Sequence, residues 1–112
     1  MLSPRKERAL VTGASSGIGK EIARVLSSQG CDLVITARRR LELENLSKEL
    51  TDRHSIDVKV VVADLSDQVG AENLIRETGE IDILVNNAGY GFLGEHMKLN
   101  QEGQLNMINL NI

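Results

Sequence analysis

The chain has 112 residues, 41% of them hydrophobic and only 2% aromatic, and its formal net charge is −3 with an isoelectric point near 5.4. This length suits one domain with an aliphatic core, and the acidic charge argues against nucleic acid or an anionic membrane as a partner. No apolar run is long enough to span a membrane, and the basic segment 1–7 lacks the apolar core of a signal peptide.

Cys31 is the only cysteine, so no disulfide can form within the chain. We interpret it as a small apolar residue at the start of a strand, in a reducing, cytoplasmic compartment. His54 and His96 are isolated and lack metal-ligand spacing, so no metal site is expected.

Apolar runs and amphipathic stretches alternate along the sequence. We expect a strand over 8–12, then a helix over 17–28 whose apolar face carries Ile18, Ile22, Val25 and Leu26. A strand over 32–37 with a helix over 39–53 follows, and then a strand over 57–63 with a helix over 68–78. A fourth strand covers 81–86, and a loop to about residue 100 leads into a fourth helix. Continuously apolar strands fit a parallel sheet covered on both faces, so the sequence predicts a doubly wound, Rossmann-like α/β fold.

The turn after the first strand is rich in glycine, with the sequence Thr12-Gly13-Ala14-Ser15-Ser16-Gly17-Ile18-Gly19. Gly13 permits a tight exit from the strand, Gly17 removes a side chain where a pyrophosphate would approach, and Gly19 lets the helix pack close to the sheet. Free N–H groups and the dipole at the helix start favour an anion there. The Gly-x-x-x-Gly-x-Gly spacing differs from the commonest dinucleotide fingerprint, and the alternative is a turn that only connects two elements.

This loop, together with Asn86-Asn87-Ala88-Gly89, resembles the short-chain dehydrogenase/reductase family over about residues 8–112. The resemblance implies strand order 3-2-1-4 in the part present, a nicotinamide cofactor, a small carbonyl or alcohol substrate and an oligomer of identical chains. It implies that the cofactor is bound by two groups of residues. One is the glycine loop and the other is the end of the fourth strand: Gly13, Ser15, Ser16, Gly17, Ile18 and Gly19, with Asn87, Ala88 and Gly89.

The end of the second strand indicates which cofactor is preferred. A NAD site usually has an acidic residue about 20 positions after the glycine loop, but Ala37 stands there, followed by Arg38, Arg39 and Arg40. Three cations at a helix start oppose the helix dipole. A bound anion explains this cluster better than a solvated helix face does. For Arg40 alone we accept the solvated helix face. A ribose 2′-phosphate suits the planar guanidinium, so we expect NADP(H) over NAD(H), with Arg38 as the first contact and Arg39 as the second.

The third strand ends in Val62-Ala63-Asp64-Leu65. The family resemblance implies that Asp64 accepts a hydrogen bond from the adenine amino group and that Leu65 packs on the ring. The alternative is that Asp64 caps the next helix. Because Ser66 or Asp67 stands closer to that helix, we assign the cap to one of them and leave Asp64 for adenine.

The expected fourth helix carries Asn106, Asn109 and Asn111, although asparagine is a poor helix former. The resemblance matches Asn111 to the family's catalytic asparagine, which supports a water in a proton relay. An exposed polar helix face is the alternative, and we accept it for Asn106.

The family's chemistry also needs a Ser and a Tyr-x-x-x-Lys pair, in which Tyr is the general acid. Tyr90 is the only tyrosine, Gly94 stands four positions after it, and no serine follows Ser66. We therefore interpret the sequence as the N-terminal, cofactor-binding part of a longer carbonyl reductase or alcohol dehydrogenase, ending inside the fourth helix and inactive alone. The strand at 81–86 would then be an exposed apolar edge that favours association. The alternative is a non-catalytic NADP(H)-binding or redox-sensing module.

Overall fold

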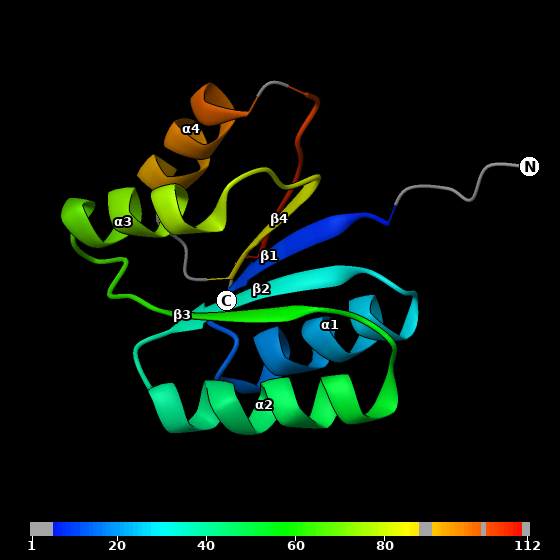
Figure 1. Ribbon diagram of the computed structural model, residues 1–112. Helices are drawn as coiled ribbons and strands as arrows, with labels where there is room; N and C mark the ends of the chain where they lie inside the picture. The colour runs from blue at the N-terminus through cyan, green and yellow to red at the C-terminus, as the bar shows by residue number, and fades with distance from the viewer. Residues whose placement is uncertain (1–5, 88–90, 102, 111–112) are drawn as a thin grey trace, which may run out of the picture.

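The computed structural model describes residues 6–87, 91–101 and 103–110. Within them strands and helices alternate throughout (Figure 1). The elements are β1 (Arg8–Thr12), α1 (Gly17–Ser28), β2 (Asp32–Ala37), α2 (Arg40–Arg53), β3 (Val58–Val62), α3 (Gln68–Thr78), β4 (Ile83–Asn86), α4 (Gly91–Asn100) and β5 (Asn106–Asn109).

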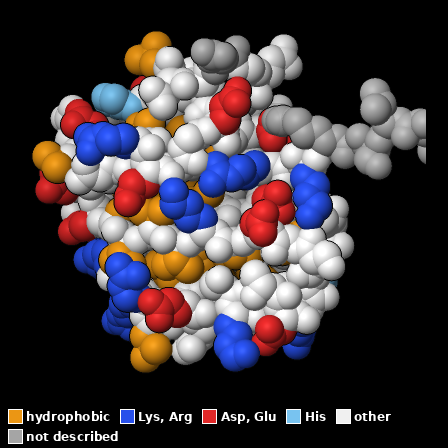
Figure 2. All heavy atoms as spheres, in the orientation of Figure 1, with side chains coloured by type: hydrophobic (Ala, Val, Ile, Leu, Met, Phe, Trp, Pro, Cys, Tyr) orange, Lys and Arg blue, Asp and Glu red, His pale blue; other side chains and the backbone are white. Residues whose placement is uncertain are grey.

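The strands form one parallel sheet in the order β3-β2-β1-β4-β5. This confirms the predicted doubly wound architecture and the order 3-2-1-4, to which β5 adds a fifth strand. Helices α1 and α2 cover one face of the sheet, and α3 and α4 cover the other (Figure 1). The outer strand β3 faces the viewer, and Figure 2 shows apolar side chains in a band across this face, between charged side chains.

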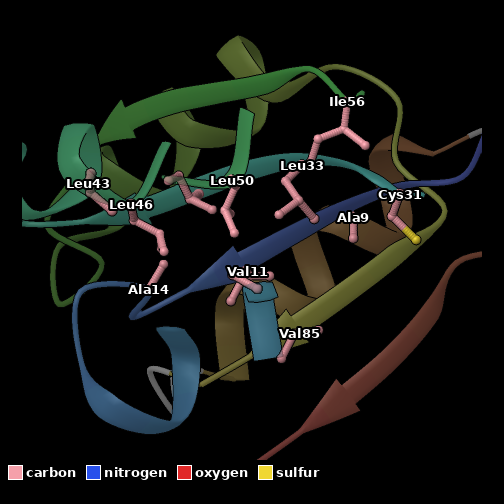
Figure 3. Close-up of a cluster of buried hydrophobic side chains, with 12 residues drawn as sticks. Ala9, Val11, Ala14, Cys31, Leu33, Leu43, Leu46, Leu50, Ile56 and Val85 are labelled. Atoms are coloured by element: carbon pink, nitrogen blue, oxygen red, sulfur yellow. The ribbon is translucent and has the colours of Figure 1, made fainter. Parts of the chain in front are cut away.

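Successive strand residues point to opposite faces of the sheet, so apolar side chains are available on both faces. They form two aliphatic layers, one on each face, against which the helices pack. On the α1/α2 side, Leu33 and Ile35 pack with leucines of α2. Figure 3 shows Leu33 beside Leu50 of that helix. On the α3/α4 side, Leu10, Val34 and Leu84 pack with residues of α3 and α4. The long helix side chains with at most 2% exposure in these layers are Leu43, Leu46, Leu50, Leu74, Leu93 and Met97.

Helix α1 buries a different stripe from the one that the sequence predicted. Its buried residues are Gly19, Ala23 and Ser27, spaced four apart, with Ile22 and Leu26 half-buried beside them. Ile18 and Val25 are 51% and 53% exposed, so placing them on the buried face was wrong. Small residues occupy the centre of the contact because they let the helix axis approach the sheet closely.

The segment after β4 also differs from the prediction. Helix α4 occupies Gly91–Asn100, where a loop was expected, because Leu93 and Met97 provide a fully buried i, i+4 pair. The chain then turns back, and the Gln101 side chain accepts a hydrogen bond from Ile81 N at 2.9 Å and donates one to Gly79 O at 3.2 Å.

The residues expected to form the fourth helix are a strand instead. β5 pairs in register with β4, from Ile83 opposite Asn106 to Asn86 opposite Asn109. Two further backbone bonds extend this pairing, from Asn106 N to Asp82 O at 2.9 Å and from Leu110 N to Asn86 O at 3.2 Å. The predictions that Asn106 and Asn109 are helical and that β4 is an exposed edge were therefore wrong. Asparagine is disfavoured in strands as well as in helices, so it is the pairing with β4 that decides the conformation of this segment.

Among the described residues, no helix combines the length and the apolar character that crossing a membrane would need.

Candidate functional site

The residues singled out from the sequence gather at one edge of the sheet. In a parallel sheet the carboxyl ends of all strands lie on the same edge, so the segments that follow β1, β2 and β3 and the end of β4 meet there. Between β1 and β4 the connections change from the α1/α2 face to the α3/α4 face (Figure 1). Such a switch point opens a crevice outside the strand ends, which is the usual ligand site of open α/β sheets.

The glycine loop is built by close backbone contacts. Gly13 has a φ of 63°, a left-handed conformation that favours glycine, and it turns the chain out of β1. A Cβ on Gly19 would lie 2.3 Å from Gly13 O and 2.7 Å from Asn87 Nδ2, so a larger residue there would collide with backbone. Ala14, which follows Gly13, donates its N–H to Thr36 O at 3.1 Å, and this bond ties the loop to β2.

The N-terminus of α1 is open at this edge. Ser16 is its N-cap residue, but the Ser16 hydroxyl donates to Gly13 O at 2.9 Å and does not cap the helix. The first turn carries no acidic residue. Gly17 and Ile18 are exposed, and a Cβ on Gly17 would have no described atom within 4 Å. The N–H groups of this turn therefore provide a suitable position for an anion.

The asparagines at the end of β4 tie neighbouring strands together. Asn87 N donates to Thr12 Oγ1 at 2.8 Å, and Asn87 Nδ2 donates to Gly13 O at 3.2 Å. Asn86 Nδ2 donates to Asn109 Oδ1 at 3.3 Å. Asn87 Oδ1 is buried and has no hydrogen-bond partner among the described residues. Thr12 was not proposed as a site residue, although its position directly before the first glycine was the available signal.

The three arginines after β2 have different surroundings. Arg39 is the N-cap of α2, and its Nη1 lies 3.1 Å from Glu42 Oε1. Arg40 begins the helix, and its Nη1 lies 3.6 Å from Glu44 Oε1. Arg38 is exposed and forms no hydrogen bond or ion pair with another residue that the structure describes. Arg38 is thus the one member of this cluster whose guanidinium is uncommitted.

Asp64 lies exposed at the end of β3, and its orientation is fixed by Ser66. Ser66 Oγ and Ser66 N both donate to Asp64 Oδ1, at 2.6 and 3.0 Å. The Ser66 hydroxyl, followed by the Ser66 N–H and the positive charge of Arg38, lowers the pKa of Asp64, so this carboxyl is ionised at neutral pH. Asp67 caps α3 by accepting from Val69 N at 3.0 Å, which confirms the assignment of the cap to Ser66 or Asp67.

Other predicted site residues lie differently. The Leu65 side chain is only 6% exposed and packs in the α3/α4 layer, so what it offers at the edge is its backbone. Ser15 is half-buried in the glycine loop. Ala88, Gly89 and Asn111 lie outside the described residues.

Comparisons with known proteins agree with this geometry. The sequence pattern of the short chain dehydrogenase family matches residues 7–112. Dehydrogenase/reductase SDR family member 7 of Mus musculus is 39% identical over 108 residues, covering 90% of this chain and 32% of that relative.

Two solved structures share the fold. The NADPH dependent reductase YwfH, involved in bacilysin biosynthesis, has a TM-score of 0.70 and 35% identity, covering 74% of this chain and 37% of that one. A short-chain dehydrogenase from Sphingobium yanoikuyae in complex with NADPH has a TM-score of 0.69 and 38% identity, covering 74% of this chain and 34% of that one.

The chain spans 32% and 49% of the lengths of the first two curated relatives that it matches. The segment shared with them contains the glycine loop, the sheet edge around it and the asparagines that close β4. Since the family pattern covers residues 7–112, the protein belongs to the short-chain dehydrogenase/reductase family, whose oxidoreductases use a nicotinamide cofactor.

Proposed function

We propose that this chain is the cofactor-binding portion of a carbonyl reductase or alcohol dehydrogenase, which transfers a hydride between NADP(H) and a carbonyl/alcohol pair. The observation that carries the proposal is the uncommitted guanidinium of Arg38, at the same sheet edge as the open N-terminus of α1. An arginine there suits a ribose 2′-phosphate, while Ala37 lacks the carboxylate that a NAD site would use. The two NADPH-associated structural neighbours support the same choice.

In this proposal each part of the edge binds one part of the cofactor. The pyrophosphate lies at the start of α1, against the loop that also places Ser15 and Ser16, where N–H groups and the helix dipole stabilise negative charge. Arg38 binds the 2′-phosphate with help from Arg39, and ionised Asp64 accepts from the adenine amino group beside the Leu65 backbone. The remaining contacts are assigned to the loop and the end of β4: Gly13, Gly17, Ile18, Gly19, Asn87, Ala88 and Gly89.

The bound cofactor supplies the hydride for carbonyl reduction, and the substrate oxygen must then receive a proton from an acid. Asn111 is assigned to support a water in that proton relay. The Tyr-x-x-x-Lys pair that acts as the acid in this family does not occur in the 112 residues. The chain's own contribution is therefore to bind and orient the cofactor, and the substrate is a small carbonyl or alcohol.

Calorimetric titration with NADPH and NADH tests the proposal. Arg38→Ala should weaken NADPH binding by about 10- to 100-fold, because a hydrogen bond to a charged group is worth roughly 1.5–3 kcal/mol. NADH binding should change little, since NADH lacks the 2′-phosphate. Arg40→Ala removes the same charge from a side chain paired with Glu44 and should leave both affinities near their original values. Equal losses of NADPH and NADH binding in Arg38→Ala would contradict the assignment.

A further inference from the structure

We propose that Glu42 limits the preference for the 2′-phosphate by holding Arg39 in an ion pair, so that selectivity depends mainly on Arg38. This inference rests on the proposed NADP(H) site and adds a specificity-determining residue to it. It predicts that removing the charge of Glu42 strengthens binding of the 2′-phosphate.

The contact between the two side chains is direct. Arg39 Nη1 donates to Glu42 Oε1 at 3.1 Å, across one turn of α2. Residues three apart on a helix face each other, so the pair needs no rearrangement to form. The Arg39 side chain is 77% exposed and the Glu42 side chain 37%. The guanidinium is therefore the freer partner, and the carboxylate is the anchor.

Two observations describe the surroundings of Glu42. It lies in the first turn of α2, where the helix dipole stabilises a negative charge. It also lines an open pocket of about 120 Å³ between α1 and α2, together with Lys20, Asn45 and Glu49. The charge of Glu42 is therefore close to the helix start where the 2′-phosphate is proposed to bind, and it competes with that phosphate for Arg39.

The neighbouring arginines show how the ion pair with Glu42 makes Arg39 less available to a phosphate. Arg38 forms no ion pair within 4 Å with a described carboxylate, although its charge acts on Asp64, and Arg40 is paired with Glu44 at 3.6 Å. A phosphate that recruits Arg39 must break or share the bond to Glu42, whereas recruiting Arg38 breaks none. Exposed ion pairs are typically worth about 0.4–1 kcal/mol, so releasing Arg39 should strengthen binding of the 2′-phosphate by roughly two- to fivefold.

The test uses two probes that differ only in the 2′-phosphate, 2′,5′-ADP and 5′-AMP, titrated into the chain by calorimetry. Glu42→Gln keeps the shape of the side chain and removes its charge. It should strengthen 2′,5′-ADP binding by roughly two- to fivefold and leave 5′-AMP binding unchanged. Glu44→Gln is the matched control, because it makes the same charge change two residues further along α2 and releases Arg40 instead. It should leave the ratio of the two affinities unchanged.

The double variant Arg39→Ala/Glu42→Gln shows whether the effect passes through Arg39. In an Arg39→Ala background, Glu42→Gln should no longer change 2′,5′-ADP binding. An undiminished gain in that background would overturn the inference, because it would show simple repulsion between Glu42 and the phosphate. Unchanged or weaker 2′,5′-ADP binding in Glu42→Gln would overturn it as well, while leaving the proposed cofactor intact. A wild-type chain that binds both probes equally would overturn the cofactor preference itself, and this inference with it.

Discussion

Gly17 and Gly19 lie two positions apart in one loop, but their surroundings differ. A Cβ on Gly19 would collide with Gly13 O and Asn87 Nδ2, while a Cβ on Gly17 would meet nothing within 4 Å among the described atoms. Gly17 therefore leaves space in which a ligand can bind, whereas the fold requires glycine at position 19.

A pair of alanine substitutions separates these two roles. Gly19→Ala should lower the free energy of unfolding by about 1–3 kcal/mol, since backbone must move to admit the methyl group. Gly17→Ala should keep that free energy or raise it by up to about 1 kcal/mol, because alanine is the better helix former. It should nevertheless weaken NADPH binding, since the methyl group would stand where we place the pyrophosphate. Urea unfolding and calorimetric titration measure the two quantities, and a Gly17→Ala chain that binds NADPH normally would refute the assignment of Gly17.

At the scale of elements, α1 and α2 are joined by a forked ion pair. Arg24 Nε and Nη2 donate to Glu49 Oε2 and Oε1 at 2.8 and 2.9 Å, and Arg24 also contacts Glu21. The hydrogen bonds from Arg24 lower the pKa of Glu49 below its ordinary range. A carboxyl with a depressed pKa stabilises the fold above its unfolded-state pKa, and this contribution is lost as the pH falls through the folded-state value.

Glu49→Gln should therefore lower the unfolding temperature near neutral pH by a small, measurable amount. The difference from the wild-type chain should shrink as the pH falls below about 4.3, the ordinary value for glutamate. Asp52→Asn, on the same helix, removes a carboxylate from the exposed pair with Lys48 and serves as the control, with a smaller effect at every pH. Thermal unfolding followed by circular dichroism over a pH series measures this. A Glu49→Gln difference that stays constant into acid would contradict the role of the ion pair.

The sequence predicted the first three β-α units well, because each combines an apolar strand with an amphipathic helix of ordinary length. Helix α3 runs through Gly70, although glycine is a poor helix former. A Cβ there would lie 2.1 Å from Asp64 O, so the close turn between β3 and α3 requires glycine at this position. Hydrophobic periodicity does not reveal such a contact.

Prediction failed where local signals were weakest. In the segment Gly91–Asn100, the glycines favoured the prediction of a loop, but Leu93 and Met97 pack in the layer with α3 and stabilise a helix. In the segment Asn106–Asn109, pairing with β4 decided the conformation, which a helical period could not indicate. For the site, the glycine loop and the asparagines of β4 were predictable because their motif is specific. The ion pairs that distinguish Arg38 from Arg39 and Arg40 were not, because they depend on side-chain positions.

At the scale of the whole molecule, we expect cofactor binding without carbonyl reduction by these 112 residues. The glycine loop, Arg38 and Asp64 lie at one sheet edge, but Tyr90, the only tyrosine, is followed four positions later by Gly94 and not by lysine. Calorimetry with NADPH should give a binding signal, and NADPH absorbance should stay constant when ketones are added. Turnover above the buffer rate would contradict this expectation. Because β4 is paired on both sides, the association expected from an open β4 edge no longer has a structural basis.

The place of β1 in the sheet has a consequence for how the chain acquires its structure. β1 is the earliest strand in the sequence but lies in the middle of the sheet, between β2 and β4. Its contacts with the β4 side reach far along the chain, as in the bond from Arg8 N to Asp82 Oδ2 across 74 positions. During synthesis β1 can pair with β2 early, but its other edge stays open until the residues of β4 have left the ribosome. Contacts this distant slow folding, so the late arrival of β4 sets the earliest moment at which the centre of the sheet can close.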